Sequence, residues 1–147
     1  MRGGVGAPPG VAVTTVRHRV PFYETDAMGV VHHSNYVRYL ELARIAWLDE
    51  HDQPYTRYIE ADRQLATIRV EVDYHRATRF DDRIEISVWL DWVRHASLRL
   101  VYELVCQGAV VATAATEHCA IAAEGRPRRI PPERRVVLAK LAANPIA

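Results

Sequence analysis

Residues 23–49 read YETDAMGVVHHSNYVRYLELARIAWLD, and this stretch decides the fold. Four apolar side chains in its second half recur at helical spacing and form one stripe: Tyr36, Leu40, Ala43 and Trp47. Three more apolar residues widen the stripe: Leu42, Ile45 and Leu48. We therefore expect a helix over residues 35–49 that is buried on most sides, with Ser34 or Asn35 capping its first turn.

Further segments of the chain alternate between apolar and polar residues with a period of two, which predicts strands. The predicted strands are residues 14–20, 68–74, 84–92, 98–106 and 109–123. Gln107-Gly108 predicts a tight turn between the last two strands, and residues 133–143 predict a terminal amphipathic helix. A long apolar helix must be buried, and one antiparallel five-stranded sheet in meander-like order can curl around it. The predicted class is α+β, in the hotdog arrangement.

Size and composition limit the possibilities. The 147 residues suffice for one domain, so we expect a flexible lead-in at residues 1–13 and a single domain at 14–147. A net charge of +1 gives no general attraction to nucleic acid or membrane, and no apolar segment is long enough to span a membrane. The absence of a signal peptide predicts a cytoplasmic protein, in which Cys106 and Cys119 stay reduced.

The loop before the predicted helix carries the residues of chemical interest. Asp26 lies shortly before a helix start, where free N–H groups and the helix dipole favour negative charge. A carboxylate held there can attack a carbonyl or deprotonate water while the N–H groups stabilise the oxyanion. The alternative role for Asp26 is an Asx-turn. The adjacent His32 and His33 have no partner at zinc spacing, so we expect no metal.

Three runs of residues carry a resemblance to a known family. They are Thr25-Asp26-Ala27-x-Gly29-Val30-Val31-x-His33-x-Asn35-Tyr36, Leu40-Glu41-x-Ala43-Arg44 and Gly125-Arg126-Pro127-Arg128-Arg129-Ile130-Pro131. The chain thereby resembles the 4-hydroxybenzoyl-CoA thioesterase family of hotdog enzymes, from about residue 19 to 132. The resemblance implies hydrolysis of an acyl or aryl thioester to a carboxylic acid and a free thiol. It implies no cofactor, with CoA or phosphopantetheine present only as part of the substrate.

The resemblance also implies an assembly and a set of site residues. The assembly is a homodimer with sheets joined edge to edge, paired again into a homotetramer, with active sites at the dimer interface. Asp26 is implied to be the nucleophile or general base, and the backbone N–H of His33 is implied to bind the carbonyl oxygen. The expected substrate-binding residues are Tyr23, Gly29, Val31, Asn35, Arg94, Arg126, Arg128 and Arg129. The arginines are expected to meet CoA phosphates.

Two alternative functions stay open. The chain could release acyl or polyketide chains from an acyl carrier protein of secondary metabolism, because the same arginines could dock an acidic carrier helix. It could also be a non-catalytic acyl-binding module of the same fold, against which Asp26 beside a helix start argues. Hotdog dehydratases need a histidine on the long helix, whereas residues 35–49 offer Glu41 and Asp49.

Overall fold

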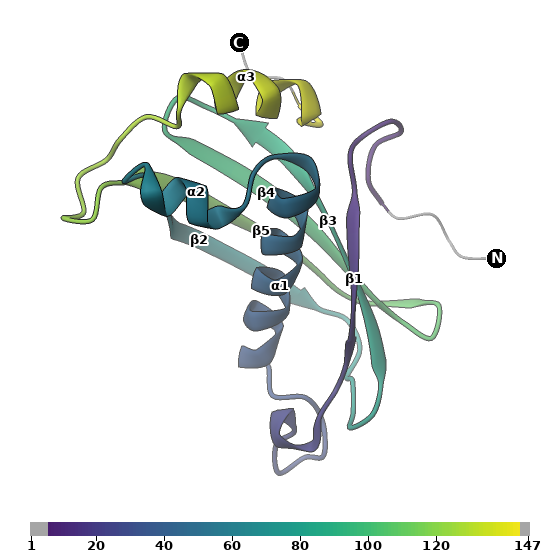
Figure 1. Ribbon diagram of the computed structural model, residues 1–147. Helices are drawn as coiled ribbons and strands as arrows, with labels where there is room; N and C mark the ends of the chain where they lie inside the picture. The colour runs from purple at the N-terminus through teal and green to yellow at the C-terminus, as the bar shows by residue number, and fades with distance from the viewer. Residues whose placement is uncertain (1–5, 145–147) are drawn as a thin grey trace.

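The structure is a computed structural model that describes residues 6–144, and it forms a curved antiparallel sheet with a long helix on one face (Figure 1). The strands are β1 (Thr14–Arg19), β2 (Gln64–Tyr74), β3 (Arg83–Val93), β4 (Ser97–Cys106) and β5 (Ala109–Ile121). The helices are η1 (Phe22–Glu24, a single 3₁₀ turn), α1 (Ser34–His51), α2 (Tyr55–Glu60) and α3 (Pro132–Leu141). The predicted α+β class and its five strands are confirmed.

The order of strands across the sheet is β1-β3-β4-β5-β2. β3, β4 and β5 form the predicted meander, and Gln107 and Gly108 make its last turn with positive φ angles of 51° and 77°. The predicted meander is wrong for β2, which pairs with β5 at the far edge rather than with β3. Alternation tells which side chains share a face of a strand, but it leaves open which strand lies next to it.

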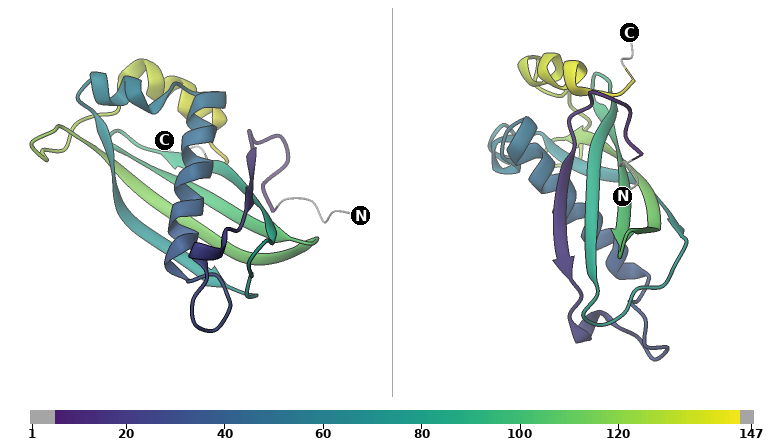
Figure 2. Two further views of the ribbon diagram at one scale, coloured as in Figure 1. Left: turned by 60° about the horizontal axis from the view of Figure 1, so that its bottom comes forward. Right: turned by 90° about the vertical axis from the view of Figure 1, so that its right-hand side faces the viewer.

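α1 crosses one face of the sheet and packs against β1 and β3 (Figure 2). The predicted apolar stripe is confirmed, since all four of its side chains are buried. The prediction that the helix is buried on most sides is wrong in part, because Leu42 is 51% exposed. Within one chain the sheet covers only one side of α1, and the apolar Ile68 and Val70 of β2 are exposed as well.

The ends of the chain bear on two further predictions. Residues 1–5 of the predicted lead-in and residues 145–147 lie outside the described residues, so the flexible lead-in and the single domain stay predictions. Nearer to β1, the carbonyl of Ala12 accepts a hydrogen bond from Nε1 of Trp47 (3.2 Å).

Cys106 and Cys119 are free thiols. In the described part of the chain, no helix has the length and apolar character needed to cross a membrane.

A cluster of polar side chains surrounds His118, which lies on β5. His118 is fully buried, with Nε2 2.8 Å from Oγ1 of Thr116 and Nδ1 3.2 Å from Oγ1 of Thr67. The hydroxyl of Tyr102 also meets Thr116 and accepts a hydrogen bond from Arg44 of α1. Burial, and to a lesser extent the charge of Arg44, lowers the pKa of His118 to about 3. The folded protein therefore holds this imidazole neutral.

This neutral imidazole predicts a loss of stability in mild acid. The pKa of His118 is lower in the folded state than in the unfolded state, where it is about 6.5. Its contribution to stability is complete above pH 6.5 and is lost as the pH falls toward 3. Between pH 8 and pH 5 we expect this residue alone to reduce the free energy of unfolding by about 2 kcal/mol. Urea unfolding across this range should show a shallower pH dependence for His118→Gln than for wild type.

A matched control for this prediction is His75→Gln, since His75 is exposed. This control should keep the wild-type pH dependence. If His118→Gln keeps it too, His118 is not held neutral by the fold.

Candidate active site

The segment between β1 and α1 folds into a tight loop around Asp26. The Asp26 N–H donates to the carbonyl of Val30 (2.9 Å), and the Gly29 N–H donates to the carbonyl of Asp26 (2.9 Å). Gly29 has a φ of +76°, a conformation that glycine adopts without strain. Oδ1 of Asp26 accepts the Met28 N–H (2.9 Å), so the Asx-turn is present. Its other oxygen, Oδ2, accepts no hydrogen bond from any described residue.

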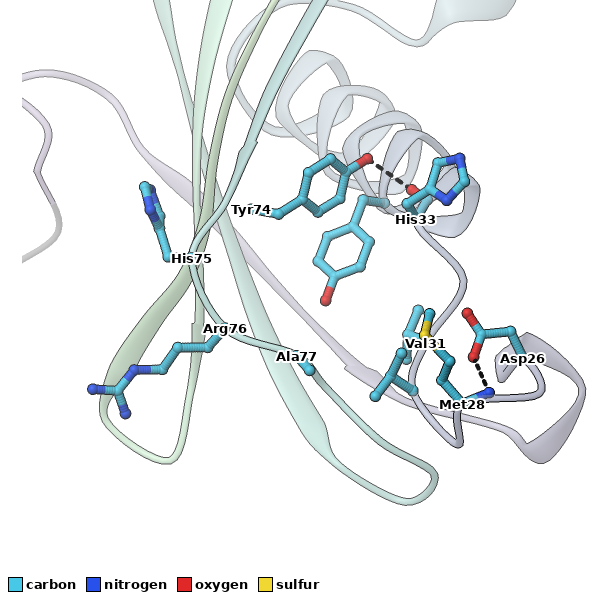
Figure 3. Close-up of a pocket in the computed structure, with 10 residues that line it drawn as sticks. Asp26, Met28, Val31, His33, Tyr74, His75, Arg76 and Ala77 are labelled. Carbon is cyan, nitrogen blue, oxygen red and sulfur yellow. Dashed lines mark hydrogen bonds between the residues drawn. The ribbon is translucent and has the colours of Figure 1, made fainter.

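A cavity of about 290 Å³ opens between this loop, the start of α1 and the end of β2. Figure 3 shows Asp26 and Met28 on the loop side, with Tyr74 on the side of β2 and His33 at the helix start. The full lining is Asp26, Met28, Val30, Val31, His33, Tyr36, Tyr74, His75, Arg76 and Ala77. One carboxylate therefore faces a cavity whose walls are largely apolar and aromatic.

The start of α1 differs from the predicted one. The helix begins at Ser34 with His33 as its N-cap, so the prediction that Ser34 or Asn35 is the cap is wrong. The Ser34 N–H is bonded to Nδ1 of His32 (3.2 Å), and the Asn35 side chain donates to the carbonyl of Glu24 (2.9 Å). The Ser34 hydroxyl also lies 2.8 Å from Nδ1 of His32, so the side chains of Ser34 and Asn35 both contact the preceding loop and neither caps the helix. The His33 N–H donates no hydrogen bond to any described residue, and it lies at the positive end of the helix dipole.

Two tyrosines form the far wall of the cavity. The Tyr74 hydroxyl donates to the carbonyl of His33 (2.9 Å), and the Tyr36 hydroxyl meets Oγ1 of Thr78 (2.7 Å). The two rings pack edge to face with centroids 5.0 Å apart. Burial raises the pKa of both hydroxyls, so both are neutral at physiological pH. Among residues 6–144, no three His, Cys, Asp or Glu side chains are arranged to hold a metal ion.

Four of the predicted site residues lie together, and two lie apart from the cavity. Asp26, Val31 and His33 line the cavity, and Gly29 shapes the loop beside it. Two further residues, Tyr23 and Asn35, are not among the lining residues. Tyr23 is 81% exposed, and Asn35 is buried with its amide bonded to backbone. Their roles in substrate binding stay predictions.

The predicted arginines lie at the opposite end of the sheet within one chain. β1 ends at Arg19, close before the Asp26 loop, and Arg83 at the start of β3 pairs with it. The 11 residues of β3 then extend roughly 33 Å before Arg94 is reached. Arg94 lies over the ring of Trp92, with its guanidinium carbon 4.1 Å from the centroid. Figure 1 shows the segment that follows β5, which carries the other arginines, at this same end.

The arginines of that segment have partners of their own. Arg126 pairs with Glu124 (3.4 Å), Arg128 pairs with Asp62 (3.3 Å), and the carbonyl of Arg129 accepts a hydrogen bond from Arg63 (2.9 Å). Within one chain they lie at the opposite end of the sheet from the Asp26 loop. Their role toward CoA stays a prediction.

Sequence reasoning missed the wall residues at the end of β2 and directly after it. Tyr74, His75 and Arg76 reach the cavity because the Val31 N–H donates to the carbonyl of Thr78 (2.7 Å), which joins the two loops. Figure 3 shows the Arg76 side chain extending away from the other lining residues. The one signal in the sequence was Tyr74, the last apolar residue of the alternating strand.

Comparisons with known proteins agree with this geometry. Residues 20–141 match the thioesterase-like superfamily. The acyl-CoA thioester hydrolase YbgC of Escherichia coli O6:H1 is 34% identical over 88 residues, which are 59% of this chain and 65% of YbgC, just under two thirds of its length. A crystal structure of an Aquifex aeolicus protein is 34% identical, has a TM-score of 0.79 and covers 85% of this chain and 98% of its own. A DHNA-CoA thioesterase from Staphylococcus aureus shares the fold, with a TM-score of 0.84 at 20% identity over 88% of this chain and 90% of that protein.

Proposed function

Since this chain belongs to the thioesterase-like superfamily and has its hotdog fold, we propose that it hydrolyses acyl-CoA thioesters with Asp26 as the catalytic carboxylate. Membership of this family makes the chain a thioester hydrolase. The observation that carries the finer proposal is that Asp26 and His33 line one cavity. Among residues 6–144, nothing donates to one oxygen of the Asp26 carboxylate, and nothing accepts from the helix-start amide of His33.

The two groups have complementary tasks in thioester hydrolysis. The His33 N–H donates a hydrogen bond to the thioester carbonyl oxygen and, with the helix dipole, stabilises the negative charge that develops there. Oδ2 of Asp26 then either attacks the carbonyl carbon or takes a proton from an attacking water. In the first route a mixed anhydride forms, the thiolate leaves, and water hydrolyses the anhydride. Both routes end in a carboxylic acid and a free thiol.

The cavity walls indicate the kind of acyl group. Its volume of about 290 Å³ lies at the small end of the range for ligand pockets, roughly 300–1,000 Å³. Val31, Tyr36 and Tyr74 offer apolar and aromatic contacts without a charge. A short aliphatic or a single-ring aryl group suits these walls. No resident cofactor is part of this proposal.

A homodimer is part of the proposal. β2 is an edge strand, and exposed edges of this kind are normally covered. Its exposed Ile68 and Val70, with Leu42 of α1, form apolar surface that a second copy can bury. A second copy is also what can bring arginines to the mouth of the cavity. The pairing of two dimers into a tetramer and the cytoplasmic location stay predictions.

Thiol release from a panel of acyl-CoAs tests the proposed substrate class. The panel contains short aliphatic, long aliphatic, benzoyl and hydroxybenzoyl thioesters, each also loaded on an acyl carrier protein. We expect kcat/KM above about 10⁴ M⁻¹ s⁻¹ for a short or aryl CoA ester, and at least tenfold less for long chains. Turnover restricted to carrier-bound chains would support the carrier-protein alternative. Binding of acyl-CoA without any hydrolysis would support the non-catalytic module.

A further inference from the structure

We propose that Glu24 is a positioning residue, which fixes the Asp26 loop against the start of α1, and that His18 and Tyr39 hold its carboxylate in place. The inference rests on the proposed function, because its consequence for catalysis requires Asp26 and His33 to be the reacting groups. It adds three residues, none of which lines the cavity.

The Glu24 carboxylate is buried and bonded to side chains from two other elements. Its side chain is only 8% exposed, and burying a carboxylate is costly unless hydrogen bonds replace its water. Oε1 accepts the hydroxyl proton of Tyr39 (2.6 Å) from α1 and lies 2.8 Å from Nε2 of His18 on β1. Burial, and then the hydrogen bond to Glu24, raises the pKa of Tyr39, so its hydroxyl remains a donor. β1, η1 and α1 therefore meet at one carboxylate.

The backbone of Glu24 joins the two ends of the catalytic loop. Its carbonyl accepts the His32 N–H (2.9 Å) and the Asn35 side-chain amide (2.9 Å). Glu24 precedes Asp26 by two residues, and His32 directly precedes His33. A shift of Glu24 thus moves the Asp26 carboxylate relative to the His33 amide. Catalysis depends on such placement, since an error of about 1 Å can cost about 100-fold in rate.

Tyr39→Phe is the sharpest test, because it removes one hydroxyl and keeps the ring in the core. We expect kcat for the best acyl-CoA to fall about tenfold, the equivalent of about 1.4 kcal/mol, with KM within about twofold of wild type. Glu24→Gln is expected to lower kcat as well. The two changes should be non-additive in the double variant, since both disrupt the same contact.

The chain offers a matched control in Tyr58. This tyrosine is also fully buried and donates its hydroxyl to a carboxylate, that of Asp52, but it lies on α2 away from the cavity. Tyr58→Phe should lower the unfolding midpoint about as much as Tyr39→Phe and leave kcat per folded molecule unchanged. Equal kcat losses in the two variants, or no loss in Tyr39→Phe, would overturn the positioning role.

Hydrogen exchange gives a second readout that does not depend on activity. Amides of residues 25–35 should exchange at least about tenfold faster in Tyr39→Phe than in wild type, and at the wild-type rate in Tyr58→Phe. Unchanged exchange in Tyr39→Phe contradicts the inference. An inactive wild-type protein contradicts the proposed function instead, and the exchange comparison still decides whether Glu24 holds the loop.

Discussion

Asp26→Asn is expected to lower kcat for thioester hydrolysis by at least about 1,000-fold, because a neutral amide can neither attack the carbonyl nor accept a proton from water. The asparagine oxygen can still accept the Met28 N–H, so the loop should keep its fold. Steady-state thiol release, with the unfolding midpoint measured alongside, checks both statements. A single turnover in ¹⁸O-labelled water also tests whether Asp26 attacks the carbonyl or deprotonates water. Label recovered in the Asp26 carboxylate identifies Asp26 as the nucleophile.

The matched control for Asp26 is Asp73→Asn. Asp73 is an exposed carboxylate on β2, directly before the cavity residue Tyr74, and its side chain points to the opposite face of the strand. This variant should keep kcat within about twofold of wild type. If Asp26→Asn keeps more than a tenth of wild-type activity, Asp26 has only its Asx-turn role and the mechanism is wrong.

Trp47→Ala is expected to cost about 3–5 kcal/mol of unfolding free energy, the largest loss of stability that we predict for a single substitution. Trp47 is fully buried in the core between α1 and the sheet, and its Nε1 donates to Ala12. The substitution leaves a large cavity and an unpaired carbonyl. Urea unfolding measures this loss of free energy when wild type and variant are fitted with the same m-value, the slope of unfolding free energy against urea concentration.

Trp92→Ala provides the comparison for this loss. Trp92 is only partly buried and its ring stacks with Arg94. It should lose less than half as much free energy of unfolding as Trp47→Ala. Equal losses in the two variants would mean that the stripe on α1 is not the centre of the core.

Much of the fold could be predicted because its signals are local. The helical spacing from Tyr36 to Trp47 and the alternation in the strands depend on residues only a few positions apart. The helix cap could not be predicted in the same way. Asn35 is an intrinsically good cap, but its amide is bonded to the carbonyl of Glu24, and that contact exists only once the loop has folded back.

The candidate site, too, could be predicted only where its signals are local. Sequence by itself determined the types of the five strands, α1 and α3, and it placed Asp26 beside a helix start, because both follow from spacing along the chain. Only the tertiary structure decided that Tyr74 lines the same cavity as Asp26 and that Arg94 lies at the other end of the sheet. The reason is physical: strand order and loop contacts depend on packing between distant segments, which periodicity does not specify.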